Sequence, residues 1–580
     1  MIRRALMLAA VVFGVAFAAS AQTPNNFNQV TWNQWGENPQ HTGEVSVAGQ
    51  AAHRMLQDVV YDPFVAQEQA DPLSTPDLLV HYQAPLIDGD NVYMEFKSGT
   101  FTTHDHWETQ IWNEKRLHWE NGSLVTKWSF QSDWKPAPFS LLANGPYWQP
   151  VFHAVFAGSN VYVPGAGGSI YKLDKLSGAL IAHIAPLGND ADTFLGGPPA
   201  VDAAGNVYYH ASKFVHGNAW ASDVVNSWLV KVSPNGTTHF VNYASLNPGA
   251  PAGNAKCSYI FNDNQLPWPP SPDAVPPTAT CGTQRPGLNS GIGIAPDGTV
   301  YTVTTAHFID RTSYLLAVNP NLTTKWVASM RDRFNDGCNV IEPPNGTPGG
   351  CRVGSHTGVD PSQNRPGAGR VIDDSSATPT VAPDGAILYG AYTRYNYFQG
   401  HLMKFSSTGQ YLGGWPFGWD MTPNIYTHNN TYSIVFKENH YGDSGSYCDD
   451  ENFCPSDRST NPAYPEAYFI TQLSKNLNLQ WQYQNTNDLS CTRNPDGTVS
   501  CVSDHPNGFE WCVNGAVVDK NGVVYVNSED GGLYAINQGG GLRDHLFLNL
   551  AIGAAYTPLS MDGNGKIYTQ NDGHLFVVGN

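Results

Sequence analysis

Charged residues are scarce in this sequence, and positive charge is the scarcer kind. Lys and Arg total 30 of 580 residues against 49 Asp and Glu, so the formal net charge is −19, and only 14% of the chain is charged. No basic run follows the N-terminus, whereas nucleic-acid binding needs clustered Lys and Arg. Long helical bundles need more Glu, Lys and Arg than this chain has. The composition therefore excludes a nucleic-acid partner and argues against an all-helical fold.

Long apolar runs are missing as well, except near the N-terminus. Two arginines at positions 3 and 4 precede an apolar stretch over 5–18, and Ala-Ser-Ala ends at residue 21. This order is typical of a secretory signal peptide, and the stretch is shorter than the roughly 20 residues that span a bilayer. We therefore predict a signal peptide over 1–21, a mature chain over 22–580 without a membrane span, and a periplasmic or secreted location.

Cysteine is absent before residue 257, and no C-x-x-C spacing occurs. A structural zinc site is therefore disfavoured. Eight of the nine cysteines fall into close sequential pairs, as expected for disulfides in an oxidising compartment. The predicted pairs are Cys257 with Cys281, Cys338 with Cys351, Cys448 with Cys454, and Cys491 with Cys501. Cys512 is left over, and it could replace either partner of the last pair.

Glycine (57 residues), proline (41 residues) and aromatic residues (12%) are plentiful, and many of them belong to one recurring phrase. An apolar strand leads into a turn of Asp, Asn and Gly, and a β-branched residue and a tyrosine follow. Gly and Asn supply the positive φ of tight hairpins, and β-branched and aromatic residues suit strands, so each copy predicts a β-hairpin. The eight copies end at Tyr93, Tyr162, Tyr208, Tyr301, Tyr389, Tyr432, Tyr525 and Tyr568.

The spacing of these copies predicts the fold. A second short strand and a polar turn follow several copies, which makes a four-stranded unit, and the intervals average about 68 residues. Such long, uneven intervals suit propeller blades better than solenoid repeats. We predict an all-β fold, a single β-propeller with eight four-stranded blades, or seven if the copy at Tyr432 is not a hairpin. Residues 29–33 are expected to add the outer strand of the last blade and so close the ring.

Three intervals are long enough to hold insertions, and all nine cysteines fall within them. We expect disulfide-stapled loops on the ring at about 245–290, 330–375 and 440–510, because long loops in a compact domain carry function or need local staples.

One of these loops concentrates oxygen ligands. It contains Asp443, Asp449, Asp450 and Glu451, and carboxylate oxygens are the ligands that Ca²⁺ prefers. The spacing is not that of an EF-hand. We predict a calcium site at these four residues, and a solvated stapled loop is the alternative.

The chain resembles a known family in two places. Residues 32–43, Trp-Asn-Gln-Trp-Gly-Glu-Asn-Pro-Gln-His-Thr-Gly, and blade segments such as 168–178 are similar to the PQQ-like repeat propellers. That family, the quinoprotein alcohol dehydrogenase-like superfamily, includes enzymes and non-enzymatic members such as the outer-membrane assembly factor BamB. The resemblance covers nearly the whole mature chain and implies the propeller fold, which hosts several unrelated functions.

The resemblance also implies where a cofactor would lie. The family's enzymes hold a quinone on the propeller axis, between a Trp and a disulfide of adjacent cysteines, over a Ca²⁺ ion and beside an Asp base. This sequence has no adjacent Cys pair and no C-x-x-C-H haem segment. No residue matches the calcium or base positions, so the catalytic and quinone-binding residues are unknown.

Three functions follow from these observations. The first is an exported binding or scaffold propeller without a catalytic motif, whose partner is a protein or glycan in the envelope or outside the cell. The second is a PQQ- and Ca²⁺-dependent quinoprotein oxidoreductase that acts on alcohols or sugars. The third is a polysaccharide lyase or hydrolase, because aromatic residues such as Trp107, Trp112, Trp415 and Trp419 could stack on sugars, although blade packing is the favoured explanation for them. We favour the first.

Overall fold

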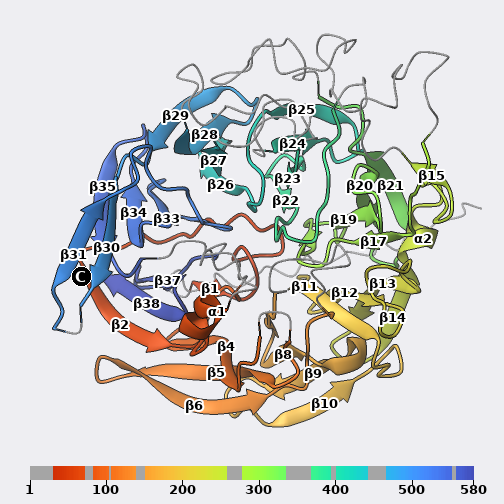
Figure 1. The fold of residues 1–580 in the computed structure, drawn as a ribbon, viewed down its shortest axis with the longest axis horizontal. Helices are drawn as coiled ribbons and strands as arrows, with labels where there is room; N and C mark the ends of the chain where they lie inside the picture. The colour runs from red at the N-terminus through yellow and green to blue at the C-terminus, as the bar shows by residue number, and fades with distance from the viewer. Residues whose placement is uncertain are drawn as a thin grey trace, which may run out of the picture.

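The computed structural model describes residues 30–71, 82–103, 106–138, 151–257, 277–334, 367–393, 400–441, 466–494, 496–550 and 557–580. Eight antiparallel sheets stand around a common axis like the blades of a propeller (Figure 1). The predicted all-β propeller is therefore confirmed, and the number of blades is eight. No helix in these residues is long and apolar enough to cross a membrane.

The first four blades follow one another along the chain. Blade 1 contains β3 (Leu86–Asp88), β4 (Asn91–Gly99), β5 (Gln110–Glu120) and β6 (Ser123–Gln131). Blade 2 contains β7 (Val155–Ala157), β8 (Asn160–Pro164), β9 (Ile170–Asp174) and β10 (Leu180–Ile184). Blade 3 contains β11 (Thr193–Val201), β12 (Val207–Lys213), β13 (Asn226–Val232) and β14 (Thr238–Asn242). Blade 4 contains β17 (Gln284–Pro286) and β18 (Gly293–Ile294), which both pair with β19 (Val300–Ala306), and then β20 (Ser313–Val318) and β21 (Thr324–Ser329).

The other four blades complete the ring. Blade 5 contains β22 (Thr380–Val381), β23 (Ile387–Ala391), β24 (His401–Phe405) and β25 (Tyr411–Trp415). Blade 6 contains β26 (Asn424–His428), β27 (Thr431–His440), β28 (Ala467–Ser474) and β29 (Leu479–Gln484). Blade 7 contains β32 (Val517–Val518), β33 (Val524–Asn527), β34 (Gly532–Ile536) and β35 (Leu542–Phe547). Blade 8 contains β36 (Ser560–Met561), β37 (Ile567–Asn571), β38 (His574–Gly579) and, on its outer edge, β2 (Arg54–Val60).

Small elements decorate the ring. Two separate hairpins are made by β15 (Lys256–Cys257) with β16 (Ala279–Thr280), and by β30 (Leu489–Arg493) with β31 (Val499–Ser503). The helices are short: α1 (Val65–Ala70), α2 (Tyr243–Leu246) and the 3-10 turn η1 (Ala166–Gly168).

All eight sequence phrases lie at the turn between the innermost and the second strand of a blade, including the phrase at Tyr432. Their aspartates stabilise these turns. In Asp202, Asp519 and Asp562, Oδ1 accepts hydrogen bonds from the backbone N–H groups two and four residues later, at 2.8–3.0 Å. This Asx-turn geometry explains why the same short phrase recurs once per blade.

Tryptophans on outer strands dock one blade on the next. Trp128 of blade 1 donates its indole N–H to the Lys175 carbonyl of blade 2 at 3.0 Å and lies against Gly178, where a Cβ atom would be only 2.7 Å from the indole ring. Trp326 of blade 4 repeats the contact on Ser407 and Gly409 of blade 5. These Trp and Gly residues are therefore part of blade packing, as the sequence indicates.

The connections divide the ring into two unlike faces. On one face, which we call the turn face, every connection between paired strands of a blade is short, as between Asp88 and Asn91 or between Glu120 and Ser123. On the opposite face, the insertion face, lie the connections from the second to the third strand and from one blade to the next. These include the long steps from Asn242 to Gln284, from Ser329 to Thr380 and from His440 to Ala467. Long connections therefore all leave the ring on one side.

An N-terminal strand closes the ring, but it is not the segment that the sequence indicates. β2 pairs with β38, with Asp58 opposite Phe576 and Val60 opposite His574, and completes blade 8. Residues 29–33 were the expected closing strand. Instead, β1 (Thr31–Trp32) pairs with β3 on the inner edge of blade 1. The correction has a physical reason: Trp32 is 1% exposed and belongs in the core, whereas β2 alternates between exposed and half-buried residues, as an outer strand does.

Disulfide bonds staple the two extra hairpins. Cys257 pairs with Cys281, and Cys491 pairs with Cys501, so two of the four predicted pairs are joined in the structure. Cys512 is free and buried, which removes it as an alternative partner in the last pair. The other two predicted pairs, Cys338 with Cys351 and Cys448 with Cys454, lie outside the described residues.

Candidate functional site

The axis of the ring is crossed by the chain itself. Residues 31–50, the axial segment, run through the middle of the ring (red in Figure 1) and contact the inner strands of the blades in chain order, beginning with β1 on β3. Further hydrogen bonds, one for each of blades 2 to 8, join Asn33 to Phe156, Gln34 to Val201, Pro39 to Ile294, Gln40 to Val381, Thr42 to Ile425, Val45 to Val518, and Gln50 to Gly565, at 2.6–2.9 Å. All of them join backbone groups except the bond to blade 3, where the side-chain oxygen of Gln34 accepts from the Val201 N–H.

These contacts lie at the turn-face end of the axis. Val201, Ile294, Val381 and Val518 are the last or nearly the last residues of their inner strands, immediately before the turns that carry the sequence phrases. Because the axial segment bonds to all eight blades there, the chain closes its own axis at the turn face.

Trp35 connects the axial segment to a polar cluster beside it. The indole is fully buried, packs edge-on against His153 with ring centroids 5.5 Å apart, and donates to Thr422 Oγ1 at 2.9 Å. The Thr422 hydroxyl donates to the side chain of Asn514 at 3.1 Å. Asn514 in turn donates to Ser376 Oγ at 2.5 Å. The cluster therefore joins the connections that precede blades 5, 6 and 7.

Asp420 is the charged member of this cluster. One carboxylate oxygen accepts from the Ser375 hydroxyl and the Ser376 backbone N–H, each at 3.0 Å, and the other lies 3.9 Å from Lys437 Nζ. Burial raises the pKa of Asp420 to about 7, and the ammonium of Lys437 opposes the rise.

A second group lies nearby, on the connection to blade 7 and at the end of its second strand. Glu510, Cys512 and Glu529 place their ligand atoms within 4.8 Å of one another, so among the described residues they could hold a cation. Burial, with both carboxylates adding to it, raises the pKa of the Cys512 thiol well above its usual range. A protonated thiol is neither a good nucleophile nor a good metal ligand, so this arrangement favours an inert buried thiol.

Buried cations near the insertion face are held by carboxylates. Arg285 makes a two-pronged ion pair with Asp373, with both N–O distances 2.6 Å, and its guanidinium lies over the Trp220 ring. Lys97 lies 2.7 Å from Asp62 and 3.4 Å from Glu68. These charges are therefore already neutralised by the protein.

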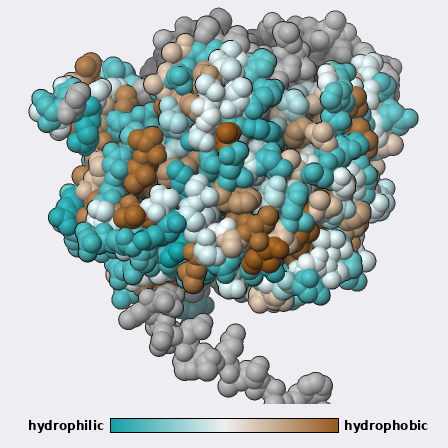
Figure 2. All heavy atoms as spheres, turned by 90° about the horizontal axis from the view of Figure 1, so that it is seen from below, coloured by the Kyte–Doolittle hydropathy of each residue, from teal (hydrophilic) through white to brown (hydrophobic). Residues whose placement is uncertain are grey.

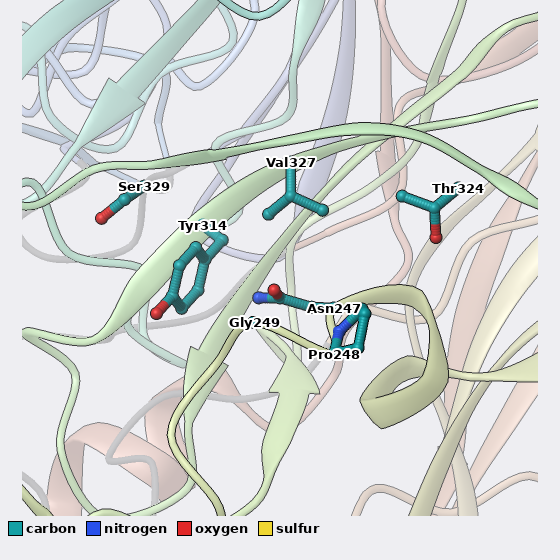
Figure 3. A pocket seen from close by; sticks show the side chains of 7 residues that line it. All are labelled: Asn247, Pro248, Gly249, Tyr314, Thr324, Val327 and Ser329. Carbon is teal, nitrogen blue, oxygen red and sulfur yellow. The ribbon is translucent and has the colours of Figure 1, made fainter.

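Two surface grooves are lined entirely by described residues. One, of about 400 Å³, lies between blades 3 and 4 and is lined by Asn247, Pro248, Gly249, Tyr314, Thr324, Val327 and Ser329 (Figure 3). The other, of about 640 Å³, lies at the junction of blades 8 and 1, and Trp119, Arg54, Asp90 and Lys566 are among its lining residues. The first groove holds no carboxylate, imidazole or thiol, and in the second the Lys566 ammonium covers the Trp119 ring at 4.5 Å. Neither groove presents a nucleophile beside a base.

The outer surface carries apolar residues in separated groups among hydrophilic ones, as Figure 2 shows for one side of the ring. Leu176, Leu180 and Ile181 of blade 2 are more than half exposed. Isolated exposed apolar residues are ordinary, and they do not by themselves mark an interface.

The sequence-predicted site residues are placed only in part. Asp443, Asp449, Asp450 and Glu451 lie outside the described residues, so the calcium site stays a prediction. Of the four aromatic residues considered for sugar stacking, Trp107 and Trp112 are buried. Trp415 donates to Glu438 at 3.1 Å, and Trp419 packs on Tyr392. All four take part in packing.

Sequence reasoning missed the axial segment as a structural hub and the group around Cys512. The axial segment has no periodic pattern of apolar residues, so only its Trp and Gly residues distinguish it from an ordinary loop. The second is assembled from Glu510, Cys512 and Glu529, and the turn and strand β33 between Cys512 and Glu529 conceal their proximity. The leftover cysteine was the one signal that pointed to this place.

Comparison with known proteins yields structural matches alone. No family model matches the chain, and no curated protein matches it. A europium-containing methanol dehydrogenase matches with a TM-score of 0.52 at 10% identity, over 93% of this chain and 89% of that one. Quinohemoprotein alcohol dehydrogenase from Comamonas testosteroni matches with a TM-score of 0.50 at 11% identity, over 95% and 81%. BamB from Moraxella catarrhalis gives 0.39 at 11% identity, over 91% and 99%. At these identities the two dehydrogenase matches establish a shared PQQ-like propeller fold and no shared activity.

Proposed function

We propose that this chain is an exported, non-catalytic propeller that binds a protein or glycan partner in the envelope or outside the cell. The observation that carries the proposal is the axial segment, which occupies the turn-face end of the axis and bonds to every blade. A segment that is built into all eight blades cannot leave without breaking the interior, so that end of the axis is structural and not a substrate channel.

The described residues around the axis do not fit the quinone of the enzymes with this fold. Pyrroloquinoline quinone is a tricarboxylate, so a site for it needs cations that the protein has not neutralised. Here Lys437 faces Asp420, and Arg285 is bound to Asp373. Glu510 and Glu529 add two carboxyl groups on the blade 7 side. The donor set therefore repels an anionic cofactor, and we derive no reaction through it.

The same residues give little support to a hydrolase or lyase. The buried thiol of Cys512 is held protonated, and burial lowers the pKa of His153 and of His210 to about 3 in each case. An imidazole with such a pKa cannot gain a proton near neutral pH, so neither histidine can serve as a general acid there.

We place the partner on the insertion face. Every long connection leaves the ring there, and two of them carry disulfide-stapled hairpins. Loops on a rigid scaffold are where binding residues usually lie. The turn face, by contrast, offers short Asx turns.

Export is part of the proposal. Two disulfide bonds in the described residues support an oxidising compartment, because cytosolic thiols are kept reduced.

The first experiment is a cofactor-retention test. The purified mature chain is incubated with pyrroloquinoline quinone and Ca²⁺, excess ligand is removed, and bound quinone is sought by absorbance and mass spectrometry. We expect no retention. Stoichiometric, calcium-dependent retention together with alcohol or sugar oxidation would overturn the proposal in favour of an oxidoreductase.

The second experiment locates the partner face. Tagged wild-type chain and two variants are used to capture partners from the envelope fraction of the source cells. One variant replaces residues 489–503, the β30–β31 hairpin, by a short Gly-Ser linker, and the other carries the single substitution Asn121→Asp on the turn face. We expect weaker capture with the hairpin variant alone. Loss with the turn-face variant alone would move the partner site to the opposite face.

A further inference from the structure

A group of buried acids lies at the junction where blade 8 meets blade 1. Glu95 on β4 and Glu114 on β5 are directly opposite in the strand register. Opposite residues of an antiparallel pair project from the same face of the sheet, with Cβ atoms about 4.5–5.5 Å apart. Glu95 is 1% exposed and Glu114 is 0% exposed, so two carboxyl groups are buried side by side.

These carboxyl groups lack the partners that buried polar atoms normally have. Neither oxygen of Glu95 accepts a hydrogen bond of ordinary geometry, although the backbone N–H of Gln83 approaches it. Oε2 of Glu114 is also unpartnered, and its Oε1 is 3.5 Å from the amide nitrogen of Gln83. Three carboxylate oxygens are thus buried and unsatisfied, which is costly unless something else binds them.

Gln83 is an independent sign of a missing ligand. Its side chain is fully buried, and its amide nitrogen is directed at Glu114, while its carbonyl oxygen, Oε1, has no partner. A half-turn of the Gln83 amide exchanges its nitrogen and oxygen and would direct Oε1 at Glu114. Two carboxylates and, after that rotation, an amide carbonyl then offer oxygen atoms, with no nitrogen or sulfur ligand among these three residues. Oxygen-only donor sets select hard cations, and Ca²⁺ in particular tolerates irregular geometry.

The charge of the buried carboxylates favours a divalent ion over a monovalent one. Next to Glu95 and Glu114 lie Asp62, Glu68 and Lys97, with Lys97 bound to the other two at 2.7 and 3.4 Å. Lys97 is already bound by Asp62 and Glu68, so the charges to be matched are those of Glu95 and Glu114. A divalent cation matches these two carboxylates when both are ionised, whereas a monovalent ion leaves one negative charge.

The group also bridges the ring closure. Asp62 follows β2, its backbone N–H donates to the Gly573 carbonyl of blade 8, and it accepts a hydrogen bond from Tyr82 beside blade 1. Gln570 of blade 8 donates to the backbone carbonyl of Gln83 at 2.7 Å. An ion held by Glu95, Glu114 and Gln83 would therefore sit where the two ends of the ring meet.

We propose that Glu95, Glu114 and Gln83 form a buried site for one calcium ion in blade 1, beside its junction with blade 8. None of its three residues belongs to the acidic segment 443–451, and the site serves stability. It does not depend on whether the chain is a binding protein or an enzyme.

The test starts from the full mature chain stripped of metal with EGTA. Calcium is added at pH 8, where the carboxyl groups can ionise, and binding is measured by elemental analysis after desalting and by the shift of the thermal midpoint. We expect at least one ion per chain and a higher midpoint. Terbium, which replaces calcium, should give luminescence sensitised by aromatic residues, because Trp112 lies beside Lys97 with its ring centroid 6.0 Å from Nζ.

Variants identify the site. E95Q/E114Q should bind calcium at this site at least 100-fold more weakly than the wild type and lose the terbium signal. In EGTA it should fold at least as well as the wild type, because positions 95 and 114 no longer bury a carboxylate. E108Q, an exposed carboxylate, is the matched control and should bind normally. D449N/D450N, in the loop predicted from sequence, should keep the terbium signal and the calcium-dependent midpoint shift.

Two results would overturn the proposal. One is a wild-type midpoint that calcium does not move, which would mean that Glu95 and Glu114 are buried as protonated acids. The other is a midpoint shift that survives in E95Q/E114Q and disappears in D449N/D450N, which would assign the ion to the loop. If E95Q/E114Q does not fold, E114Q alone repeats the measurement.

Discussion

Glu37 holds an unusual backbone conformation in the middle of the axial segment. Its φ is 77°, in the left-handed region that costs most residues about 1–2 kcal/mol. The preceding Gly36, with a φ of 61°, could not be replaced, because a Cβ atom there would lie 2.8 Å from His41. Burial also raises the pKa of the Glu37 carboxyl to about 8. The segment therefore reverses direction at the cost of local strain.

Replacing Glu37 should reveal that strain. Glu37→Gly removes the left-handed penalty, whereas Glu37→Ala removes the same carboxyl and keeps it. We expect the Gly variant to be more stable than the Ala variant by about 1 kcal/mol. Urea unfolding of the two variants measures the difference. An Ala variant as stable as the Gly variant would show that position 37 relaxes out of the left-handed region.

Asp420 should make stability depend on pH. Its pKa is raised to about 7, so the folded state holds the proton more tightly than the unfolded state does. The stabilisation of the folded state that comes from this tighter proton binding is therefore complete below about pH 4, and it is lost as the pH rises through 7. Asp420→Asn, which mimics the protonated acid, removes this loss. Between pH 5 and pH 8 we expect the wild type to lose stability relative to Asp420→Asn, by an amount on the order of a few kcal/mol.

The comparison is made by thermal unfolding of both proteins at each pH. A constant difference between them would mean that the carboxylate is ionised throughout, with Lys437 compensating it. Glu108→Gln, on the surface, controls for the change in net charge.

At the scale of elements, the two disulfide-stapled hairpins differ in how they join the ring. Cys281 is 0% and Cys257 is 5% exposed, and they pack with Ala306 of β19 and Ile309. The β30–β31 hairpin is largely exposed, with every residue of Val499–Ser503 at the surface. The first hairpin is part of a core cluster, and the second is an appendage.

Removing the two disulfides should therefore have unequal effects. C257S/C281S should lower global stability by about 2–4 kcal/mol, because it opens a long loop and disturbs a buried cluster. C491S/C501S should change global stability by less than about 0.5 kcal/mol and expose residues 489–503 to proteolysis. Denaturant unfolding and limited proteolysis of both variants separate the two effects. Equal losses would contradict the assignment of the second hairpin as peripheral.

How far the sequence predicts this protein follows from how local each signal is. The hairpin phrases are predicted correctly because Asp202, Asp519 and Asp562 close their turns within four residues. β2 has no such signature, since its only strand partner is β38, more than 500 residues away, so the closing strand was placed at residues 29–33. Glu95 and Glu114 look like ordinary strand residues until the register puts them opposite each other. The candidate sites depend on such long-range contacts, and a sequence pattern cannot show them.

At the scale of the whole molecule, the N-terminal part of the chain stabilises the ring in two ways. The axial segment bonds to all eight blades from inside, and β2 completes blade 8 on the rim. The ends of the paired strands are adjacent, with Arg54 opposite Gly579. The ring is therefore held both at its axis and at its edge by residues 31–60.

Two truncations should separate the contribution of the axial segment from that of β2. Removal of residues 22–48 deletes most of the axial segment and keeps β2, so the ring should close but unfold at a lower temperature. Removal of residues 22–60 deletes β2 as well and leaves β38 as an open edge strand, which invites aggregation. We expect the longer truncation to be expanded in solution scattering and prone to associate. A monomeric, compact ring after the longer truncation would show that β2 is dispensable for closure.

The pairing of β2 with β38 also sets the order in which the protein can be finished. The axial segment and β2 are synthesised before the strands with which they pair, and they are exported before those strands if the predicted signal peptide directs export. The strand that β2 needs is made much later, because His574 of β38 follows Asp58 of β2 by 516 residues. Blades can pack around the axial segment as they are synthesised, but the ring stays open at blade 8 until β38 pairs with β2. A product of translation interrupted before β38 would leave β2 without its partner, and unpaired strand edges invite aggregation.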